Sequence, residues 1–422
     1  MFHLLKNIGS KFIIVKVFLH KNSNSDFSEY ILGITDGIED LGGLQWPLVA
    51  AHAGCWLFVF FCTFMGTSSA GKVVYVTATL PYLLITILLS YGLTLPGAFD
   101  GLYYFLVPKW EELAKGSVWL EAAIQVIFQG APAWGGLITM SSYNKFNHKV
   151  YRDAWMICIC NILTPIYAGC AIFSILGFMA HTYGTDVDNV AQSGPGLSFV
   201  AYPEGIAQMP VSPLWAVMFF LTIITVGIDS QFGMFDTLVS GLMDTFPKLR
   251  HHSIKVTAVC AVICFCCGLP LCTQGGMYIY QILDWYCASL TFSMVGFFEA
   301  VVVVYIYGLN RFCQDAELMF GWQPSWPIRI LWMITVPGVL GTMLFIGVGR
   351  LQPPTYDYTN YEYPEWAIGM GWAVACVSAA PTPIVFLYVL FTTKGDNFKD
   401  VKHKHSYFSF NFINLFVFNN RK

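Results

Sequence analysis

Glycine and proline interrupt one long apolar stretch of the sequence. The stretch reads EAAIQVIFQGAPAWGG over residues 121–136 and contains Gly130, Pro132, Gly135 and Gly136. Proline cannot donate a helical hydrogen bond, and glycine weakens a helix. A helix opened in mid-bilayer presents carbonyl oxygens to a cation and polar half-helix ends to a solute. The stretch therefore predicts a site for a small solute and its ion, or, as the simpler alternative, a packing kink.

Asp229 is the second feature that suggests chemistry. It lies in the sequence GIDSQF (227–232), inside the apolar stretch 213–240. A carboxylate within a membrane span is energetically costly and is usually functional. We therefore predict that Asp229 is a functional residue, the alternative being a carboxylate that caps a break in a helix.

The composition indicates that a membrane protein carries these residues. Of the residues, 56% are hydrophobic and 11% are charged, whereas soluble domains have ~25% charged residues. A helix needs ~20 apolar residues to cross the hydrocarbon core. About nine stretches are long enough: 45–66, 73–95, 118–140, 154–180, 213–240, 254–271, 278–308, 329–349 and 366–392. We therefore predict an all-α, polytopic membrane protein with about nine transmembrane helices.

The placement of lysine and arginine predicts the orientation of the chain. Basic residues gather in the loops after the third and fifth stretches and in the C-terminal tail, whereas the alternate loops are mostly acidic or neutral. Since positive charge favours the cytoplasmic side, the C-terminus is predicted to be cytoplasmic. We divide the chain into a divergent N-terminal segment with the end of an extracellular loop (1–37), a transmembrane domain (38–392) and a cytoplasmic tail (393–422).

Segments spread from Ile38 to Leu390 carry a further indication. Among them are IEDLGGLQW (38–46), GKVVYVTATLPYLLITILL (71–89), GLTLPGAFDGLYYFLVPKW (92–110), SSYNKFNHKVYRDA (141–154), GPGLSFVAYPEGIAQMPVSPLWAVMFF (194–220), TQGGMYIYQILDWY (273–286) and YGLNRFCQDAELMFGWQP (307–324). Together they resemble the neurotransmitter:sodium symporter family (solute carrier family 6). The resemblance implies a partial inverted-repeat symporter fold that contains the fourth to twelfth of the family's twelve helices.

The resemblance implies sodium-coupled symport of a small amino acid or neurotransmitter across the plasma membrane. The positions that match the family's substrate pocket are Phe128, Gln129, Gly130, Ala131, Trp134 and Ser230. AWGGLITMSSYNKF (133–146) is most similar to the sodium- and chloride-dependent glycine transporters. A bulky Trp134 also favours a small substrate, because an apolar pocket excludes by volume. Glycine is therefore predicted, with proline, betaine, GABA or a monoamine as alternatives.

Sodium and chloride are the ions that the resemblance implies. For one sodium ion the matching positions are the Val226 backbone carbonyl, Asp229 and Ser230, and for the other they are Asn161 and Gln129. The family usually has serine or threonine at the position of Gln129.

The chloride site is matched at one position, Gln125. Gln129 and Pro165 stand where the family has two serines. Since proline offers neither a hydroxyl nor an N–H group, these departures argue against ordinary chloride dependence.

Two carboxylates resemble the family's gating residues. Asp284 matches the outer-gate acid, and Asp244 matches the inner-gate acid, with Tyr143 expected nearby. The arginines that pair with these acids lie at or before the family's first helix. Glu299 lies within the seventh apolar stretch and has no role that the sequence identifies.

Three additional spans would be needed to match the family. No segment upstream of Leu44 can supply them, and the family's first three helices carry further sodium ligands and part of the pocket. We therefore predict that these 422 residues alone neither transport nor bind sodium tightly. We expect the chain to be an incomplete form of a transporter or, alternatively, a non-transporting regulatory or structural partner of full-length relatives in the bilayer.

Other classes of function are disfavoured by the residues themselves. Paired aspartates in the protease style, an HExxH motif and a Ser–His pair are missing from the apolar stretches, which argues against an intramembrane enzyme. The basic residues lie in short loops, as membrane topology requires, and do not indicate nucleic-acid binding.

Overall fold

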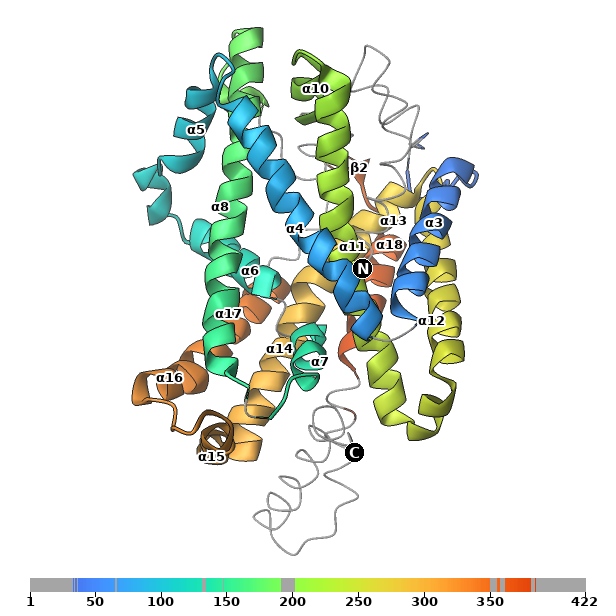
Figure 1. The fold of residues 1–422 in the computed structure, drawn as a ribbon, viewed down its shortest axis with the longest axis vertical. Helices are drawn as coiled ribbons and strands as arrows, with labels where there is room; N and C mark the ends of the chain where they lie inside the picture. The colour runs from blue at the N-terminus through green and yellow to red at the C-terminus, as the bar shows by residue number, and fades with distance from the viewer. Residues whose placement is uncertain are drawn as a thin grey trace, which may run out of the picture. The chain divides into compact units, whose positions relative to one another are not determined.

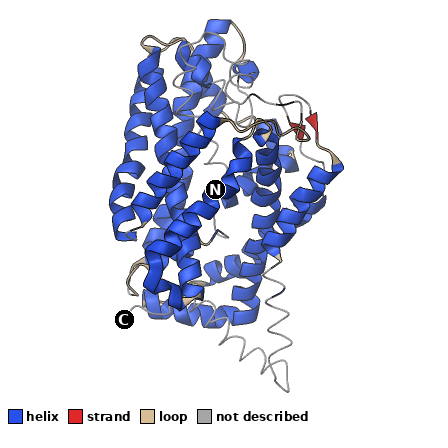
Figure 2. Cartoon of the chain, turned by 90° about the vertical axis from the view of Figure 1, so that its right-hand side faces the viewer, coloured by secondary structure: helices blue, strands red, loops and turns tan. Residues whose placement is uncertain are grey.

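Helices make up nearly all of the secondary structure. The computed structural model describes residues 33, 35, 37–64, 67–130, 134–146, 148–190, 202–349, 355–356, 361–380 and 384. In this part of the chain the only strands are β1 (Thr355–Tyr356) and β2 (Tyr361–Glu362), which pair antiparallel with Thr355 opposite Glu362. Figures 1 and 2 show the helices and this small strand pair. The prediction of an all-α protein is confirmed.

The chain divides into two compact units, which we describe separately. The first contains Met1–Ala114, Ile159–Gly233 and Ile254–Ile279, and the second contains Lys115–Cys158, Met234–Ser253 and Tyr280–Lys422. Three helices pass from one unit into the other: α8 (Val150–Tyr183), α11 (Ser212–Thr245) and α13 (Gly276–Leu283).

The remaining helices belong wholly or almost wholly to one unit. In the first unit they are α3 (Trp46–Thr63), α4 (Thr67–Gly92), α5 (Ala98–Leu106), η2 (Trp110–Ala114), α9 (Val187–Val190), α10 (Tyr202–Ala207), α12 (Ser253–Gly268) and η6 (Leu269–Cys272). In the second they are α6 (Gly116–Gly130), α7 (Gly136–Ser142), η5 (Pro247–His252), η7 (Asp284–Thr291), α14 (Phe292–Val301), η8 (Val302–Gly308), α15 (Leu309–Phe320), α16 (Trp326–Ile330), η9 (Leu331–Thr335), α17 (Val336–Gly349) and α18 (Glu365–Ala379).

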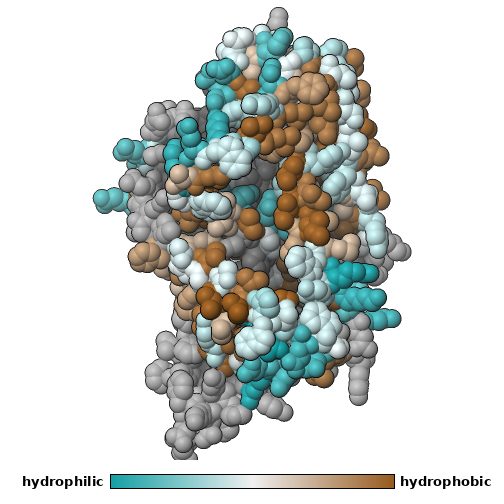
Figure 3. All heavy atoms as spheres, turned by 90° about the vertical axis from the view of Figure 1, so that its left-hand side faces the viewer, coloured by the Kyte–Doolittle hydropathy of each residue, from teal (hydrophilic) through white to brown (hydrophobic). Residues whose placement is uncertain are grey.

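Seven helical segments of the described residues are long and apolar enough to cross a membrane. They are Trp46–Thr63, Val73–Gly92, Val150–Tyr183, Ser212–Thr245, Pro247–Cys272, Phe292–Met319 and Trp326–Phe345. Each overlaps a predicted stretch. The predicted stretch 118–140 is instead divided between α6 and α7, and the end of the stretch 366–392 lies largely outside the described residues. Figure 3 shows patches of apolar side chains on one face, with polar side chains among them.

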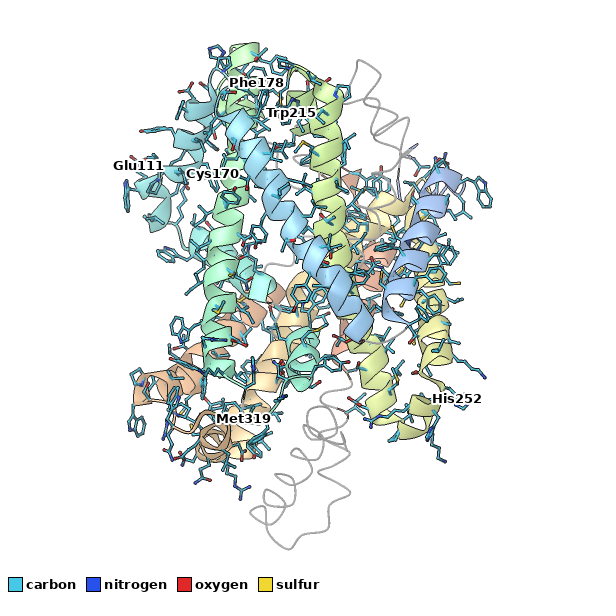
Figure 4. The ribbon with its side chains drawn as sticks, in the orientation of Figure 1. Glu111, Cys170, Phe178, Trp215, His252 and Met319 are labelled. Carbon is cyan, nitrogen blue, oxygen red and sulfur yellow. The ribbon has the colours of Figure 1, made fainter. Side chains whose placement is uncertain are left out.

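The first unit has a core in which α4, α8, α10 and α11 meet. Ile175 and Ile206 are fully buried there, and the Tyr91 ring stacks on Trp215 with centroids 4.1 Å apart. Figure 4 labels Trp215 near the start of α11 and Phe178 on α8, both of which belong to this cluster. Helix α5 also packs directly on α8, because a Cβ atom on Gly101 would collide with the backbone carbonyl of Phe173.

The second unit is built around α14, which packs against α17, and around the contact of α18 with η7. Tyr286 of η7 and Trp372 of α18 have ring centroids 5.5 Å apart. A Cβ atom on Gly371 would collide with the Tyr286 ring, so only glycine allows this approach. Segments η7, η8 and η9 are π-helical. Wide turns of this kind often occur at functional sites, and Asp284 begins the first of them.

Candidate functional site

The interrupted helix in the second unit is the centre of the candidate site. Helix α6 ends at Gly130 and α7 begins at Gly136. Gly135 has a φ angle of 73°, a left-handed conformation that favours glycine. Ala131 and Pro132 lie outside the described residues. The sequence correctly predicted an interruption between α6 and α7.

Close packing on α11 holds the beginning of α7 in place. A Cβ atom on Gly135 would lie 3.2 Å from the Thr237 Cγ2 atom. Trp134 packs against Phe292 of α14, with ring centroids 6.2 Å apart, and Phe292 is 6% exposed. The Trp134 ring therefore packs against α14 beside the break, where its volume can limit the size of a bound solute.

The other predicted pocket residues of α6 differ in exposure. Gln125 and Gln129 are exposed, and Gly130 is partly buried. The side chain of Phe128 lies outside the described part. Both glutamine side chains thus lie on the exposed surface of α6.

Three predicted sodium ligands occupy one turn of α11 in the first unit. The Ser230 hydroxyl donates a hydrogen bond of 3.3 Å to the Val226 carbonyl. Asp229, which is half-buried, accepts a hydrogen bond from the Thr77 hydroxyl of α4. This turn therefore presents a carboxylate, a hydroxyl and a carbonyl oxygen. The donor set fits a hard cation such as sodium.

The second predicted sodium site has one residue in each unit. Asn161 lies on α8 and is partly buried, and Gln129 belongs to α6. Pro165, four residues after Asn161, lies inside α8. Because proline has no N–H group, the Asn161 carbonyl lacks the donor that a helix normally supplies. The same proline offers no hydroxyl group to a chloride ion.

The predicted inner gate has different partners from those that we expected. The Tyr143 hydroxyl lies 3.2 Å from an Asp236 carboxylate oxygen, to which it donates, and 2.9 Å from the Ser240 hydroxyl. Asp244 pairs instead with Arg250 of η5, at 2.6 Å. We expected Asp244 to need an arginine from before the family's first helix, but the loop that follows α11 supplies one.

Asp236 is a residue that the sequence analysis missed. It lies two helical turns after Asp229 on α11, so an acid repeated along one face of an apolar helix was the available signal. Of the remaining carboxylates, Asp284 is exposed at the start of η7. Glu299 is partly buried within α14, and in the described part of the chain no hydrogen bond to its side chain is formed.

Comparison with known proteins decides the family. Residues 11–393 match the Sodium:neurotransmitter symporter family. This chain belongs to that family. Symporters of the family are multi-pass proteins of the plasma membrane and are transporters rather than enzymes, in agreement with the helical spans described above.

Three curated relatives have similar sequences over most of this chain. The chain is 44% identical over 374 residues to the sodium- and chloride-dependent glycine transporter 2 of Xenopus laevis, covering 88% of this chain and 47% of the relative. It is 41% identical to the sodium- and chloride-dependent glycine transporter 1 of Xenopus laevis (89% and 59% covered). It is 40% identical to the sodium- and chloride-dependent creatine transporter 1 of Bos taurus (86% and 58% covered). The chain thus spans about half the length of the symporters that it matches.

Proposed function

We propose that this chain provides the substrate-binding helix and a sodium site for the sodium-coupled symport of glycine. The observation that carries the proposal is the break between α6 and α7, located in a helix that would otherwise be long enough to cross the bilayer. In a membrane, exposed backbone groups are tolerated only where they line a cavity or are buried in protein. A break at this position therefore supports a binding site for a small polar solute.

Glycine is the proposed substrate for two reasons. The Trp134 ring, packed against the buried Phe292, takes up space beside the break. An apolar wall of this kind discriminates by volume and favours the smallest side chain. The second reason is that the relative that is 44% identical to this chain is named as a glycine transporter. A creatine transporter is nearly as similar, at 40%, so creatine is the competitor against which the assay must discriminate.

Sodium is proposed to bind at the α11 turn that contains Val226, Asp229 and Ser230. A bound cation would neutralise the Asp229 carboxylate and offset the cost of keeping it in a membrane span. The second proposed sodium site uses Asn161 and Gln129. For chloride, the exposed Gln125 is the one matching residue, and we propose that transport is less dependent on chloride than in the relatives whose names include it.

The proposed cycle is alternating access. Sodium and substrate would stabilise an occluded state at the helix break, and the gates would then open to the other side. Tyr143 and Asp244 are proposed to serve the cytoplasmic gate, and Asp284 the outer gate. The C-terminus is proposed to be cytoplasmic, because the basic loops 145–152 and 248–255 would then also face the cytoplasm.

Uptake of labelled glycine is the test. We expect these 422 residues alone to show weak sodium binding and no uptake, since further ligands in the family come from helices that match no part of this chain. A chimera should therefore be made in which this chain replaces the matched 374 residues of the glycine transporter 2. The chimera should accumulate glycine when sodium is present and not when choline replaces it.

Two controls make the assay specific. Asp229→Ala in the chimera should abolish sodium-dependent uptake, whereas creatine should neither be accumulated nor compete with glycine. Uptake that persists without sodium, or that survives Asp229→Ala, would disprove the assignment of this sodium site. Robust uptake by the 422 residues alone would disprove their predicted inactivity, and co-purification with a full-length relative without uptake would favour the regulatory alternative.

A further inference from the structure

Thr77 of α4 is the only residue that bonds to Asp229 in the described part of the chain. Its hydroxyl is hydrogen-bonded to the Asp229 Oδ1 atom, although the two residues are 152 positions apart in the sequence. In the described residues no other hydrogen bond or ion pair reaches the Asp229 side chain. The orientation of this carboxylate therefore depends on a single side chain from another helix.

The Thr77 hydroxyl has two acceptors within reach and one hydrogen to donate. The second acceptor is the Val73 carbonyl oxygen, at 3.1 Å. A hydrogen bond to an ionised carboxylate is roughly twice as strong as a bond to a neutral carbonyl. The hydrogen is therefore donated to Asp229, and the bond to Val73 is the weaker alternative that Thr77 adopts when the carboxylate is absent.

The bond fixes one carboxylate oxygen and leaves the other available. Thr77 donates to Oδ1, so Oδ2 can face a cation together with the Ser230 hydroxyl and the Val226 carbonyl on the same turn. A free aspartate side chain would have to lose rotational freedom when it binds an ion, and a side chain held in place beforehand avoids part of that loss. Thr77 thus acts on the ion through Asp229 and not by direct contact.

We propose that Thr77 is a positioning residue for the sodium site, holding the Asp229 carboxylate of α11 from the neighbouring helix α4. This inference rests on the proposed sodium-coupled function. Three residues of α11 offer oxygen ligands to the ion, and Thr77 is a fourth residue that determines how strongly sodium binds. Removing the hydroxyl should weaken sodium binding about three- to tenfold, the size expected for the net contribution of one ordinary hydrogen bond, because Thr77 acts on the ion only through Asp229.

Three variants separate this role from a general effect on folding. Thr77→Val removes the hydroxyl and preserves the shape of the side chain, and Thr77→Ser restores the hydroxyl. Thr79→Val is the matched control on α4, because the Thr79 hydroxyl donates only to backbone carbonyls, those of Tyr75 at 2.8 Å and Val76 at 3.4 Å. Two of the variants, Thr77→Val and Thr79→Val, each remove one hydroxyl from α4, and Thr77→Ser keeps it.

The readout is the thermal unfolding midpoint of the purified chimera in detergent, with sodium chloride exchanged for choline chloride at constant ionic strength. The sodium concentration for half of the stabilisation should rise about three- to tenfold in Thr77→Val. It should stay within about twofold in Thr77→Ser and Thr79→Val. In choline, Thr77→Val should lower the midpoint of the unmodified chimera more than that of its Asp229→Asn variant, because only weaker bonds to neutral acceptors remain to be lost there.

Each outcome supports or overturns the inference. If sodium stabilises the unmodified chimera but Thr77→Val and Thr79→Val respond alike, Thr77 does not position Asp229, and the proposed function stands. If sodium fails to stabilise even the unmodified chimera, the sodium site itself is wrong and the role of Thr77 is overturned with it. A Thr77→Ser variant that behaves like Thr77→Val would show that the methyl group, and not the hydroxyl, matters.

Discussion

Gly135 offers the sharpest test of the helix break, because its neighbour Gly136 provides a matched control. Gly135 has a φ angle of 73°, so alanine there would have to adopt the left-handed region. That conformation costs an L-residue about 1–2 kcal/mol. Gly136 begins α7 in a helical conformation, where alanine is favoured over glycine by about 0.4–1 kcal/mol. The two substitutions, one residue apart, should thus have opposite signs.

A second contribution comes from the packing on α11. The new Cβ atom at position 135 would lie 3.2 Å from Thr237 Cγ2, closer than an ordinary contact, whereas at position 136 the nearest atom, Thr237 Oγ1, is 3.8 Å away. Thr237→Ser removes the Cγ2 methyl group. If crowding contributes, Gly135→Ala should be partly rescued in the Thr237→Ser background, and if only backbone strain contributes, it should not be.

The assay is the free energy of unfolding of the purified chain in mixed micelles, together with glycine uptake by the chimera. Gly135→Ala should lose about 1–2 kcal/mol, which corresponds to a factor of about 5–30 in the folded-to-unfolded ratio. Gly136→Ala should be neutral or slightly stabilising. Equal stability of the two variants would refute the left-handed turn at Gly135, and with it the description of how α7 begins.

The other predictions concern the pocket, the inner gate and the loop contact of the first unit. Trp134→Ala in the chimera should admit amino acids bulkier than glycine, and an unchanged substrate range in competition assays would argue against its place in the pocket. Tyr143→Phe loses its bond to Asp236 and should destabilise the chain by about 1 kcal/mol, measured by unfolding. The Tyr104 hydroxyl donates to Asp188 between α5 and α9, which raises the pKa of Tyr104 and lowers the pKa of Asp188. The stabilisation from this contact is the difference in free energy of unfolding between the native chain and Tyr104→Phe. It should be lost as the pH falls below 3.8, the ordinary pKa of Asp188, and as the pH rises above 10.0, the ordinary pKa of Tyr104.

Hydropathy predicted the membrane helices well because it reports a property of each segment by itself. A run of apolar residues has to be helical in lipid whatever its neighbours are. The same reasoning located the break near Gly130, since the conformational limits of glycine and proline are also local. It could not locate the π-helical turns of η7, η8 and η9, because a wide turn depends on which helices pack against it.

Partners of the polar side chains were harder to predict, as the inner gate illustrates. Family resemblance located Asp244 and Tyr143 and suggested that they lie near each other. The structure pairs Tyr143 with Asp236 and Asp244 with Arg250. Both partners are local substitutes that depend on the exact turn of α11 and on the short helix η5. The resemblance gives the gate residues that are common in the family, whereas the hydrogen bonds in this chain depend on its own neighbouring side chains.

The contact between Thr77 and Asp229 shows why the remainder of the site was out of reach. No pattern of spacing connects residues on two helices that are 152 positions apart. A threonine in a membrane helix usually bonds to its own backbone, as Thr79 and Thr86 do on the same helix. The packing of α4 beside α11 makes one of these ordinary hydroxyls the partner of a half-buried acid. The ligands of a site can therefore be carried over from a family, but the residues that set the ligands' orientation, and so the strength of ion binding, have to be found in the fold of the individual chain.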